Sequence, residues 1–545
     1  MAALSLSIIR TNVGPSQAQG RAAPIPGLSY RDWGILSAAA LWAGLWVLIP
    51  VWSDVAPSGD NIEQLVWSQG LELGYHKHPP LPTWILIGAE HLFAPSLPLT
   101  YALSIAGMLI GAAFLGRLAA ELLGRGAALP AVLATGCIAF FSYRAHIYNH
   151  NTVLVPFVYA SAWFFLKAAR TGRLGFWAMF GVACAAGMLT KYQFVVVLGT
   201  FLLIAFSLRL YRQPPALLGA CVAAVVALLL LMPHILWLVG NDFPPFRYAS
   251  HMMLTRLGPL QRLDHSAGFA LQQVRDGAVA VVMLLLAAGL SRRAPPDESA
   301  RQLADPAKPT ALGDERVWIF ALGFAPLAIM LALGLFGGVE LENHWGTTAL
   351  QFTALPALYW MRQRGRTIGV SPVLLVFCTV QVAEAAYVIH DELRDRSLTL
   401  DGGRVRAFNP RELAEAAQAD WHRVTSAPLR YVVGSTTWGG FIALYATDRP
   451  QVLISGQPSA SPWVSMTDLA RCGGLYIDPI QPPAGMGQPP SATGATELPG
   501  GDGVLLRHRG EWDAVNYTNS NKGQVLRIRW TVVPPTRQCS GGLSP

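Results

Sequence analysis

The chain has 545 residues, of which 52% are hydrophobic and 13% are charged, and its mean hydropathy is +0.37. This composition excludes a single water-soluble core, because the apolar residues are collected in runs long enough to cross a bilayer. The net charge of +8 would suggest a nucleic-acid partner in a soluble chain, but here the basic residues lie in short loops between the apolar runs. The sequence therefore predicts a polytopic α-helical membrane protein.

Residues 1–30 precede the apolar runs and are expected to form a retained cytoplasmic tail. Residues 31–390 are expected to form a transmembrane domain of about 11 helices, each near the ~20 residues that a bilayer requires. The basic residues of alternate loops predict a cytoplasmic N-terminus and, with an odd number of spans, an external C-terminus. The candidate spans are 33–52, 98–118, 127–143, 152–168, 174–190, 193–211, 216–239, 277–291, 317–338, 346–361 and 368–389.

The first external loop, residues 53–97, concentrates acidic, basic and aromatic residues in the stretch GDNIEQLVWSQGLELGYHKHPPLPTW. Asp60 is followed three residues later by Glu63, which is the spacing of a capping box and predicts a helix with Asp60 as its cap. A cap also holds a carboxylate in one orientation at the mouth of a cavity. The apolar segment from Leu81 to Phe93 is too short to span, which predicts a re-entrant or interfacial helix.

Residues 391–545 are rich in Gly, Pro and Ser but contain short apolar segments, which predict a small external α/β domain. Its expected strands are RYVVGS at 430, FIALYA at 441, QVLIS at 451, GLYIDP at 474, GVLLRH at 503 and QVLRIRW at 524. The stretch GSTTWGG at 434–440 lacks the lysine of a phosphate-binding loop and is interpreted as a turn. Cys472 and Cys539 are the two cysteines outside the apolar runs, and an external location would allow them to pair.

Histidines gather at the predicted external ends of the spans, which indicates that the chemistry takes place on the external face. An interfacial preference of the amphipathic imidazole is the alternative for each one alone. The nine are His76, His78, His91, His146, His150, His234, His251, His265 and His344.

Several segments together carry a resemblance to a known family. They are Asp60 with GYHKHPPLPTW, YNHNTVLVPF at 148, LTKYQ at 189, PHILWLVGNDFPPFRYA at 233, ENHWGTTAL at 342 and YVVGSTTWGGFIALYATDRP at 431. In order and placement they resemble glycosyltransferase family 39 and its relatives, the protein O-mannosyltransferases and the lipid A aminoarabinose and galacturonic acid transferases. These enzymes share the GT-C fold, so the resemblance implies a GT-C-like membrane domain in a bacterial inner membrane.

The resemblance implies transfer of a sugar from a polyprenyl-phosphate donor to a cell-envelope acceptor, such as lipid A or another envelope glycan, at the external face. Protein O-glycosylation is one alternative. A flippase or transporter of lipid-linked sugars is another, but it predicts internal repeats and charges near mid-span, and neither is visible in the sequence. Membrane lipids are the remaining expected partners, and a nucleic acid is not expected.

The resemblance assigns roles to residues of the first loop. Asp60 matches the catalytic acid of the family, which we interpret as the base that deprotonates the acceptor hydroxyl. The family commonly has a glutamate next, but here Asn61 follows, and Glu63 is the candidate replacement one turn away. The family also commonly has a lysine directly before the proline of this loop. Here that residue is His78, so Lys77 and a protonated His78 are expected to bind the donor phosphate.

Arg247 is the third expected phosphate ligand, with a snorkelling interfacial arginine as the alternative. Snorkelling is also the alternative for Lys191, and an aromatic belt is the alternative for Trp345. The expected substrate-binding residues are Tyr75, His76, Asn151, Lys191, His344 and Trp345. No cofactor or metal is expected to be required. A divalent metal held by histidines such as His76, His78, His251, His265 and His344, with Glu63 or Glu342, stays open because no local ligand spacing is present.

Overall fold

The computed structural model describes residues 30–53, 57–251, 257–291, 312–366, 368–394, 400–401, 404–405, 409–479, 508–515, 525–536 and 539. The chain divides into two compact units, Met1–Trp42 and Ala43–Pro545. Apart from residues 30–42, the features discussed below belong to the second unit. The expected tail at residues 1–30 lies almost entirely outside the described residues.

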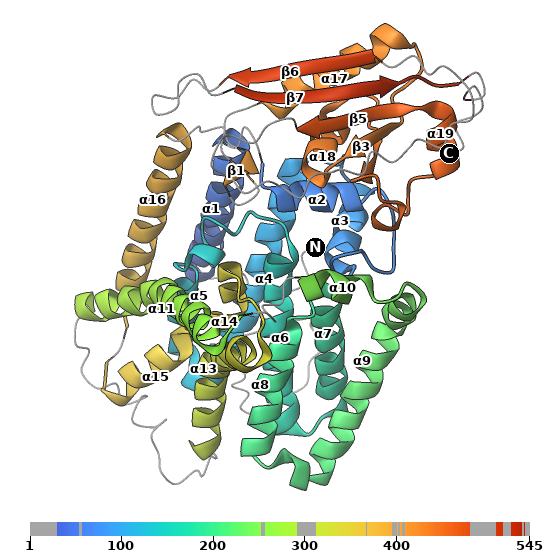
Figure 1. Cartoon of the computed structure of the whole chain (residues 1–545). Helices are drawn as coiled ribbons and strands as arrows, with labels where there is room; N and C mark the ends of the chain where they lie inside the picture. The colour runs from blue at the N-terminus through green and yellow to red at the C-terminus, as the bar shows by residue number, and fades with distance from the viewer. Residues whose placement is uncertain are drawn as a thin grey trace, which may run out of the picture. The chain divides into compact units, whose positions relative to one another are not determined.

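Long helices form the part of the chain that was predicted to lie in the membrane (Figure 1). The helices up to residue 394 are α1 (Tyr30–Ser53), α2 (Gly59–Trp67), α3 (Leu81–Glu90), α4 (Leu97–Leu123), η1 (Arg125–Ala127), α5 (Ala128–Thr135), η2 (Ala139–Phe141), α6 (His150–Thr171), α7 (Leu174–Thr190), α8 (Phe194–Ser207), η3 (Leu210–Arg212), α9 (Pro214–Gly240), α10 (Pro244–His251), α11 (Pro259–Leu290), α13 (Leu312–Gly337), η4 (Asn343–Trp345), α14 (Gly346–Ala349), α15 (Ala354–Gln363) and α16 (Val370–Arg394).

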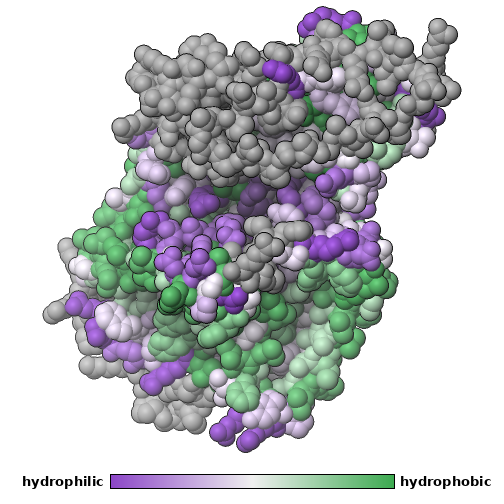
Figure 2. Space-filling model, in the orientation of Figure 1, coloured by the Kyte–Doolittle hydropathy of each residue, from purple (hydrophilic) through white to green (hydrophobic). Residues whose placement is uncertain are grey.

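Seven of the described helices are long and apolar enough to cross a membrane, namely α1, α4, α6, α9, α11, α13 and α16. The helices α7 and α8 are apolar but shorter. Helices α4, α6, α7 and α9 pack on one another in turn. Hydrophobic residues cover much of the lower surface in Figure 2, and α9 exposes large apolar side chains along its length. An apolar exposed surface of this kind fits a lipid environment.

Two of the predicted spans are not single helices. Residues 127–143 contain the last residue of η1, the eight-residue α5 and the short η2. Residues 346–361 are divided between α14 and α15. An eight-residue helix is about 12 Å long, well short of the hydrocarbon core, so the apolar pattern was misleading in these segments. The number of spans, expected to be about 11, stays a prediction.

The C-terminal part contains a five-stranded sheet with strand order β4-β3-β5-β7-β6. Strand β3 pairs in parallel with β4 and β5, and β7 pairs antiparallel with β5 and β6. The elements are β1 (Leu400–Asp401), β2 (Arg404–Val405), α17 (Pro410–Val424), β3 (Tyr431–Gly434), α18 (Thr436–Tyr445), β4 (Gln451–Ile454), η5 (Pro458–Ala460), α19 (Met466–Cys472), β5 (Gly474–Pro479), β6 (His508–Val515) and β7 (Val525–Val533). The expected α/β character is confirmed, while the strand expected at 503 lies mostly outside the described residues.

The segment at 434–445 differs from its prediction. It was expected to be a turn followed by a strand, but it forms helix α18, whose N-cap Ser435 accepts a hydrogen bond from Trp438 N. Parallel strands β3 and β4 require a crossover connection, and this helix supplies it. A short apolar run such as FIALYA does not distinguish strand from helix by itself. Cys472 and Cys539 form a disulfide, a pairing that the sequence allowed but left open.

Candidate active site

Helix α2 carries the acidic residues of the first loop. It begins at Gly59 with Ser58 at its N-cap, so Asp60 lies in the first turn and does not cap the helix. The predicted capping role of Asp60 is therefore wrong. Its Oδ2 instead accepts a hydrogen bond of 2.8 Å from Nδ2 of Asn149, which directly precedes α6. The carboxylate is thus oriented by a tertiary contact between two segments that are far apart in sequence.

The surroundings of Asp60 affect the ionisation of its carboxylate. Its side chain is exposed, yet the surrounding protein desolvates the carboxylate and raises its pKa, against the opposing effect of the hydrogen bond from Asn149. Glu63 raises the pKa further, whereas Lys77 and Lys191 lower it. Solvent access combined with desolvation is typical of a side chain in a recess. A carboxylate in this setting accepts a proton more readily than an ordinary aspartate.

Asn149 has two roles that the sequence did not reveal. Its Oδ1 accepts hydrogen bonds from the backbone N–H groups of Asn151 and Thr152 at 2.8 and 3.0 Å, which caps α6. The same side chain uses Nδ2 to hold Asp60. The segment YNHN carries the signal of a helix cap, but its pairing with a residue 89 positions earlier comes only from the fold.

The structure explains the asparagine that follows Asp60. Asn61 is fully buried, and its Nδ2 donates a hydrogen bond of 2.8 Å to Thr100 Oγ1, whose own hydroxyl donates to the Leu97 carbonyl. The position therefore needs a donor. A glutamate here would place a carboxylate, which only accepts hydrogen bonds, against Thr100 Oγ1 and the His146 carbonyl, which both act as acceptors toward Asn61.

Glu63 and Lys77 form an ion pair with an Nζ–Oε2 distance of 2.6 Å. Burial disfavours the ammonium, but the neighbouring Glu63 outweighs this effect and raises the pKa of Lys77. Lys77 is therefore a permanent cation near Asp60. Its Nζ also lies 5.5 Å from the ring centroid of Tyr248 in α10.

Arg247 is the neighbour of Tyr248 in α10. Its side chain is exposed, and Nη2 donates a hydrogen bond of 3.1 Å to the carbonyl of Asn241. The helix thus brings Arg247 into the region of Lys77, without a direct contact between the two in the part of the chain that the structure describes. Its predicted contact with phosphate stays a prediction.

The other residues of the GYHKH segment form an aromatic cluster. The rings of Trp67 and Tyr75 stack with centroids 5.0 Å apart, and the Tyr75 hydroxyl donates to a backbone carbonyl of the same loop. His76 packs edge-on against Trp67, and His78 lies 4.1 Å from the ring of His150. Burial, followed by nearby cations, lowers the pKa of His76 to about 4 and that of His78 below its usual range. We therefore expect neutral His78 to offer one N–H donor rather than a charge.

Lys191 lies beyond the end of α7 and is buried. Its Nζ donates a hydrogen bond of 2.5 Å to Asn151 Oδ1 and lies 5.5 Å from the ring centroid of Trp345. Burial lowers the pKa of Lys191 to about 7, while Asp60 and Glu342 oppose that shift. A lysine snorkelling to the interface would be exposed, so the structure favours a role inside the protein.

His344 lies near enough to Lys191 for that lysine to act on it electrostatically. Burial, with Lys191 and Arg144 as nearby cations, lowers the pKa of His344 to about 3. Arg144, whose guanidinium lies 5.2 Å from the Phe140 ring centroid, was not among the predicted residues. It belongs to the loop before α6, where no sequence pattern indicated a function.

Within the described ranges, no three or more His, Cys, Asp or Glu side chains are grouped so that they could hold a metal ion. His251, one of the histidines considered for a metal, is described by its backbone alone. His76 and His78 lie together near Glu63 through the loop they share, whereas His265 is an exposed residue of α11.

The site therefore combines one carboxylate of raised pKa with two lysines that act on it electrostatically, Lys77 and Lys191. Lys77 forms its ion pair with Glu63, and Lys191 donates its hydrogen bond to Asn151. Of the two acids Asp60 and Glu63, Asp60 is therefore the one without an ion pair among the described residues. Such an arrangement can accept a proton at Asp60 while the lysines stabilise an anion nearby.

Known proteins resemble the chain at the level of sequence. Residues 77–237 match a family model described as dolichyl-phosphate-mannose-protein mannosyltransferase. The chain is 26% identical to the lipopolysaccharide core galacturonosyltransferase RgtB of Rhizobium johnstonii over 300 residues. This aligned region covers 52% of this chain and 56% of RgtB. It is 28% identical over 229 residues to the lipopolysaccharide core galacturonosyltransferase RgtA of the same organism, and this region covers 38% of this chain and 42% of RgtA. The matches thus span about half the length of these curated relatives.

Solved structures extend the likeness to nearly the whole chain. ArnT from Cupriavidus metallidurans, solved bound to undecaprenyl phosphate, superposes with a TM-score of 0.56 at 14% identity over 94% of this chain and 100% of that one. At this identity the likeness concerns the fold alone. The resemblance to GT-C glycosyltransferases and the GT-C-like helical fold, both expected from the sequence, are confirmed.

Proposed function

We propose that the protein is a membrane glycosyltransferase that moves a sugar from a polyprenyl-phosphate donor to a cell-envelope acceptor. The observation that carries the proposal is Asp60, an accessible carboxylate of raised pKa that is oriented by Asn149 and lies near Lys77 and Lys191. A transfer of this kind needs a base for the acceptor hydroxyl and cations for the departing phosphate. The sequence relatives and the ArnT-like fold support the same reaction class.

Asp60 removes the acceptor proton, and the acceptor oxygen attacks the anomeric carbon. The bond from that carbon to the phosphate oxygen breaks, and the lipid phosphate leaves as an anion. Lys77 stabilises this anion as a point charge, with His78 as a neutral donor and Arg247 as a second cation. The candidates for holding the sugar are Lys191, Asn151, His76, His344, Trp345 and Tyr75.

Glu63 keeps Lys77 charged and raises the pKa of Asp60. We propose that this is its contribution, in place of the adjacent acid that is common in the family. It acts through its neighbours and does not itself take up the acceptor proton.

We infer that the donor lipid is undecaprenyl phosphate or a similar polyprenyl phosphate, because ArnT was solved with that lipid. The acceptor is a glycolipid of the lipopolysaccharide type, as the names of RgtB and RgtA suggest. If the acceptor group is already anionic, as in a lipid A phosphate, Asp60 would instead orient the sugar or stabilise positive charge at the anomeric carbon.

We propose that the site and the C-terminal domain, residues 391–545, face the periplasm of a bacterial inner membrane. The tail at 1–30 lies in the cytoplasm, and the transmembrane domain is residues 31–390. The disulfide between Cys472 and Cys539 supports an oxidising compartment on the C-terminal side.

The test is reconstitution of the purified protein in liposomes with a panel of radiolabelled polyprenyl-phosphate sugars and lipopolysaccharide core acceptors. Release of polyprenyl phosphate together with labelled acceptor is expected. Movement of intact donor across the bilayer without release would identify a flippase, and label on protein would identify a protein O-glycosyltransferase. Mass spectrometry of envelope lipids from a deletion strain identifies the missing sugar and acceptor.

A further inference from the structure

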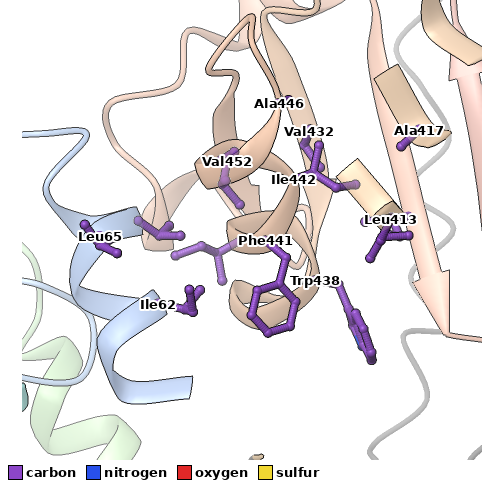
Figure 3. Close-up of a cluster of buried hydrophobic side chains, with 14 of the residues drawn as sticks. Ile62, Leu65, Leu413, Ala417, Val432, Trp438, Phe441, Ile442, Ala446 and Val452 are labelled. Atoms are coloured by element: carbon purple, nitrogen blue, oxygen red, sulfur yellow. The ribbon is translucent and has the colours of Figure 1, made fainter. Parts of the chain in front are cut away.

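The C-terminal domain packs directly on α2, the helix that carries Asp60. Helix α18 contacts α2, and their side chains share one buried cluster that includes Ile62, Leu65, Trp438 and Phe441 (Figure 3). Successive helix residues are roughly 100° apart, so Ile62 faces nearly opposite to Asp60. One face of α2 therefore lies against the C-terminal domain, while the opposite face carries the Asp60 carboxylate, which accepts a hydrogen bond from Asn149.

Two adjacent glycines allow α18 to come this close. A Cβ atom on Gly440 would lie 2.3 Å from Ile62 Cγ2 and 2.9 Å from Val66 Cγ2. A Cβ atom on Gly439 would lie 2.8 Å from Cγ1 of Val452, on the sheet side. The helix is thus packed tightly between the sheet of its own domain and α2, and neither side has room for a methyl group.

Gln69 adds a polar connection between the end of α2 and β4. Its Oε1 accepts a hydrogen bond of 2.8 Å from Val452 N, and its Nε2 donates one of 3.1 Å to the carbonyl of Pro450. Among the strands that the structure describes, β4 is the first in the sheet order and has only β3 as a neighbour. The amide of Gln69 therefore pairs with this edge much as another strand would.

Trp463 extends the contact to the loop that carries Lys77. Its Nε1 donates a hydrogen bond of 3.2 Å to the Val452 carbonyl, and its Cβ lies 2.8 Å from the place of a Cβ on Gly70. Its ring centroid is 6.4 Å from that of Tyr75, which stacks on Trp67. The loop between α2 and Lys77 is therefore supported from the C-terminal domain.

We propose that the C-terminal domain is a positioning element of the active site: α18, Gln69 and Trp463 hold α2 and the following loop so that Asp60 and Lys77 keep their places. Gln69 and Gly440 are its key positioning residues. This inference rests on the proposed transfer for its kinetic part, while its structural part is independent of it.

The test uses full-length protein in nanodiscs and compares Gln69→Ala with Gln418→Ala. Gln418 is a matched control, because its side chain also makes two hydrogen bonds to the domain, at Thr447, without touching α2 in the described contacts. In Gln69→Ala we expect faster hydrogen–deuterium exchange in residues 59–80 and a kcat about tenfold to hundredfold lower, since small misplacements of catalytic groups cost this much. Gln418→Ala is expected to change neither quantity by more than twofold.

A second pair, Gly440→Ala and Gly439→Ala, separates the two sides of α18. Gly440→Ala should speed hydrogen–deuterium exchange in residues 59–67 more than in the C-terminal sheet, because Gly440 faces α2. Gly439→Ala, which faces the sheet, should not have this effect. Unchanged exchange at residues 59–80 in Gln69→Ala, or faster exchange there with a normal kcat, would overturn the inference. If the wild type transfers none of the sugars tested, the proposed function fails, and the exchange data still decide whether the domain holds α2.

Discussion

At the scale of single residues, the pairing of Asp60 with Asn149 is the feature on which the proposed chemistry depends. We predict that Asp60→Asn lowers kcat by about two or more orders of magnitude, because general-base catalysis contributes roughly this much. The amide Oδ1 can still accept the hydrogen bond from Asn149, so the melting temperature should stay near that of the wild type. A variant with full turnover would remove Asp60 as the base.

Asn149 makes a second prediction possible, which concerns pH. The pKa of Asp60 is raised, so the base is lost as the pH falls through a value above that of an ordinary aspartate. The hydrogen bond from Asn149 lowers that pKa, and its removal should move the acid limb of kcat/KM to higher pH. Asn149→Ser keeps a capping side chain for α6 but loses the donor to Asp60. An unchanged acid limb in this variant would show that another group controls it.

At the scale of elements, the loop from α2 to α3 places Lys77 in an ion pair with Glu63 and near enough to Asp60 to lower its pKa. Lys77→Ala should remove a charge-assisted contact worth about 1.5 to 3 kcal/mol, which corresponds to about a tenfold to hundredfold loss in donor use. Kinetics with varied donor concentration measure this loss. Lys167→Ala is the control, since Lys167 pairs with Glu121 at 2.9 Å and is equally exposed. Equal effects of both variants would argue against phosphate binding by Lys77.

Helix α10 carries Arg247 beside Tyr248, which contacts Lys77. If Arg247 binds the donor phosphate, Arg247→Ala should raise the donor KM about tenfold, and Arg247→Lys should recover only part, because a lysine lacks the guanidinium fork. The exposed Arg275, paired with its neighbour Asp276, provides the control variant Arg275→Ala. Full recovery by lysine would indicate an interfacial anchor instead.

At the scale of the whole molecule, the sidedness of the C-terminal domain can be measured. Glu415 in α17 and Arg173 between α6 and α7 are exposed positions expected on opposite sides of the membrane. We predict that a membrane-impermeant maleimide labels Glu415→Cys in intact spheroplasts, and Arg173→Cys only after the membrane is opened. The reverse pattern would place the active site in the cytoplasm and contradict the proposed compartment.

The sequence by itself determined the membrane class, most of the long helices and the α/β character of the C-terminal part, because these depend on the length and period of apolar runs. Predictions from the sequence were wrong where an apolar run is compatible with more than one kind of element. FIALYA is helix α18, which supplies the crossover that the parallel strands β3 and β4 need. Residues 127–143 form the short helices α5 and η2 and no single long helix, and hydropathy alone does not distinguish the two.

The sequence also indicated the residue types of the site, since Asp60, Lys77 and Lys191 lie in the segments that carry the family resemblance. Glu63 was indicated by its place one helical turn after Asp60. Only the tertiary structure decided what each of them contacts. Asn149 reaches Asp60 across 89 positions, and Gln69 reaches the C-terminal sheet across 383. Hydrogen bonds over such separations depend on which helices pack together, and no local pattern of charge or hydropathy encodes that packing.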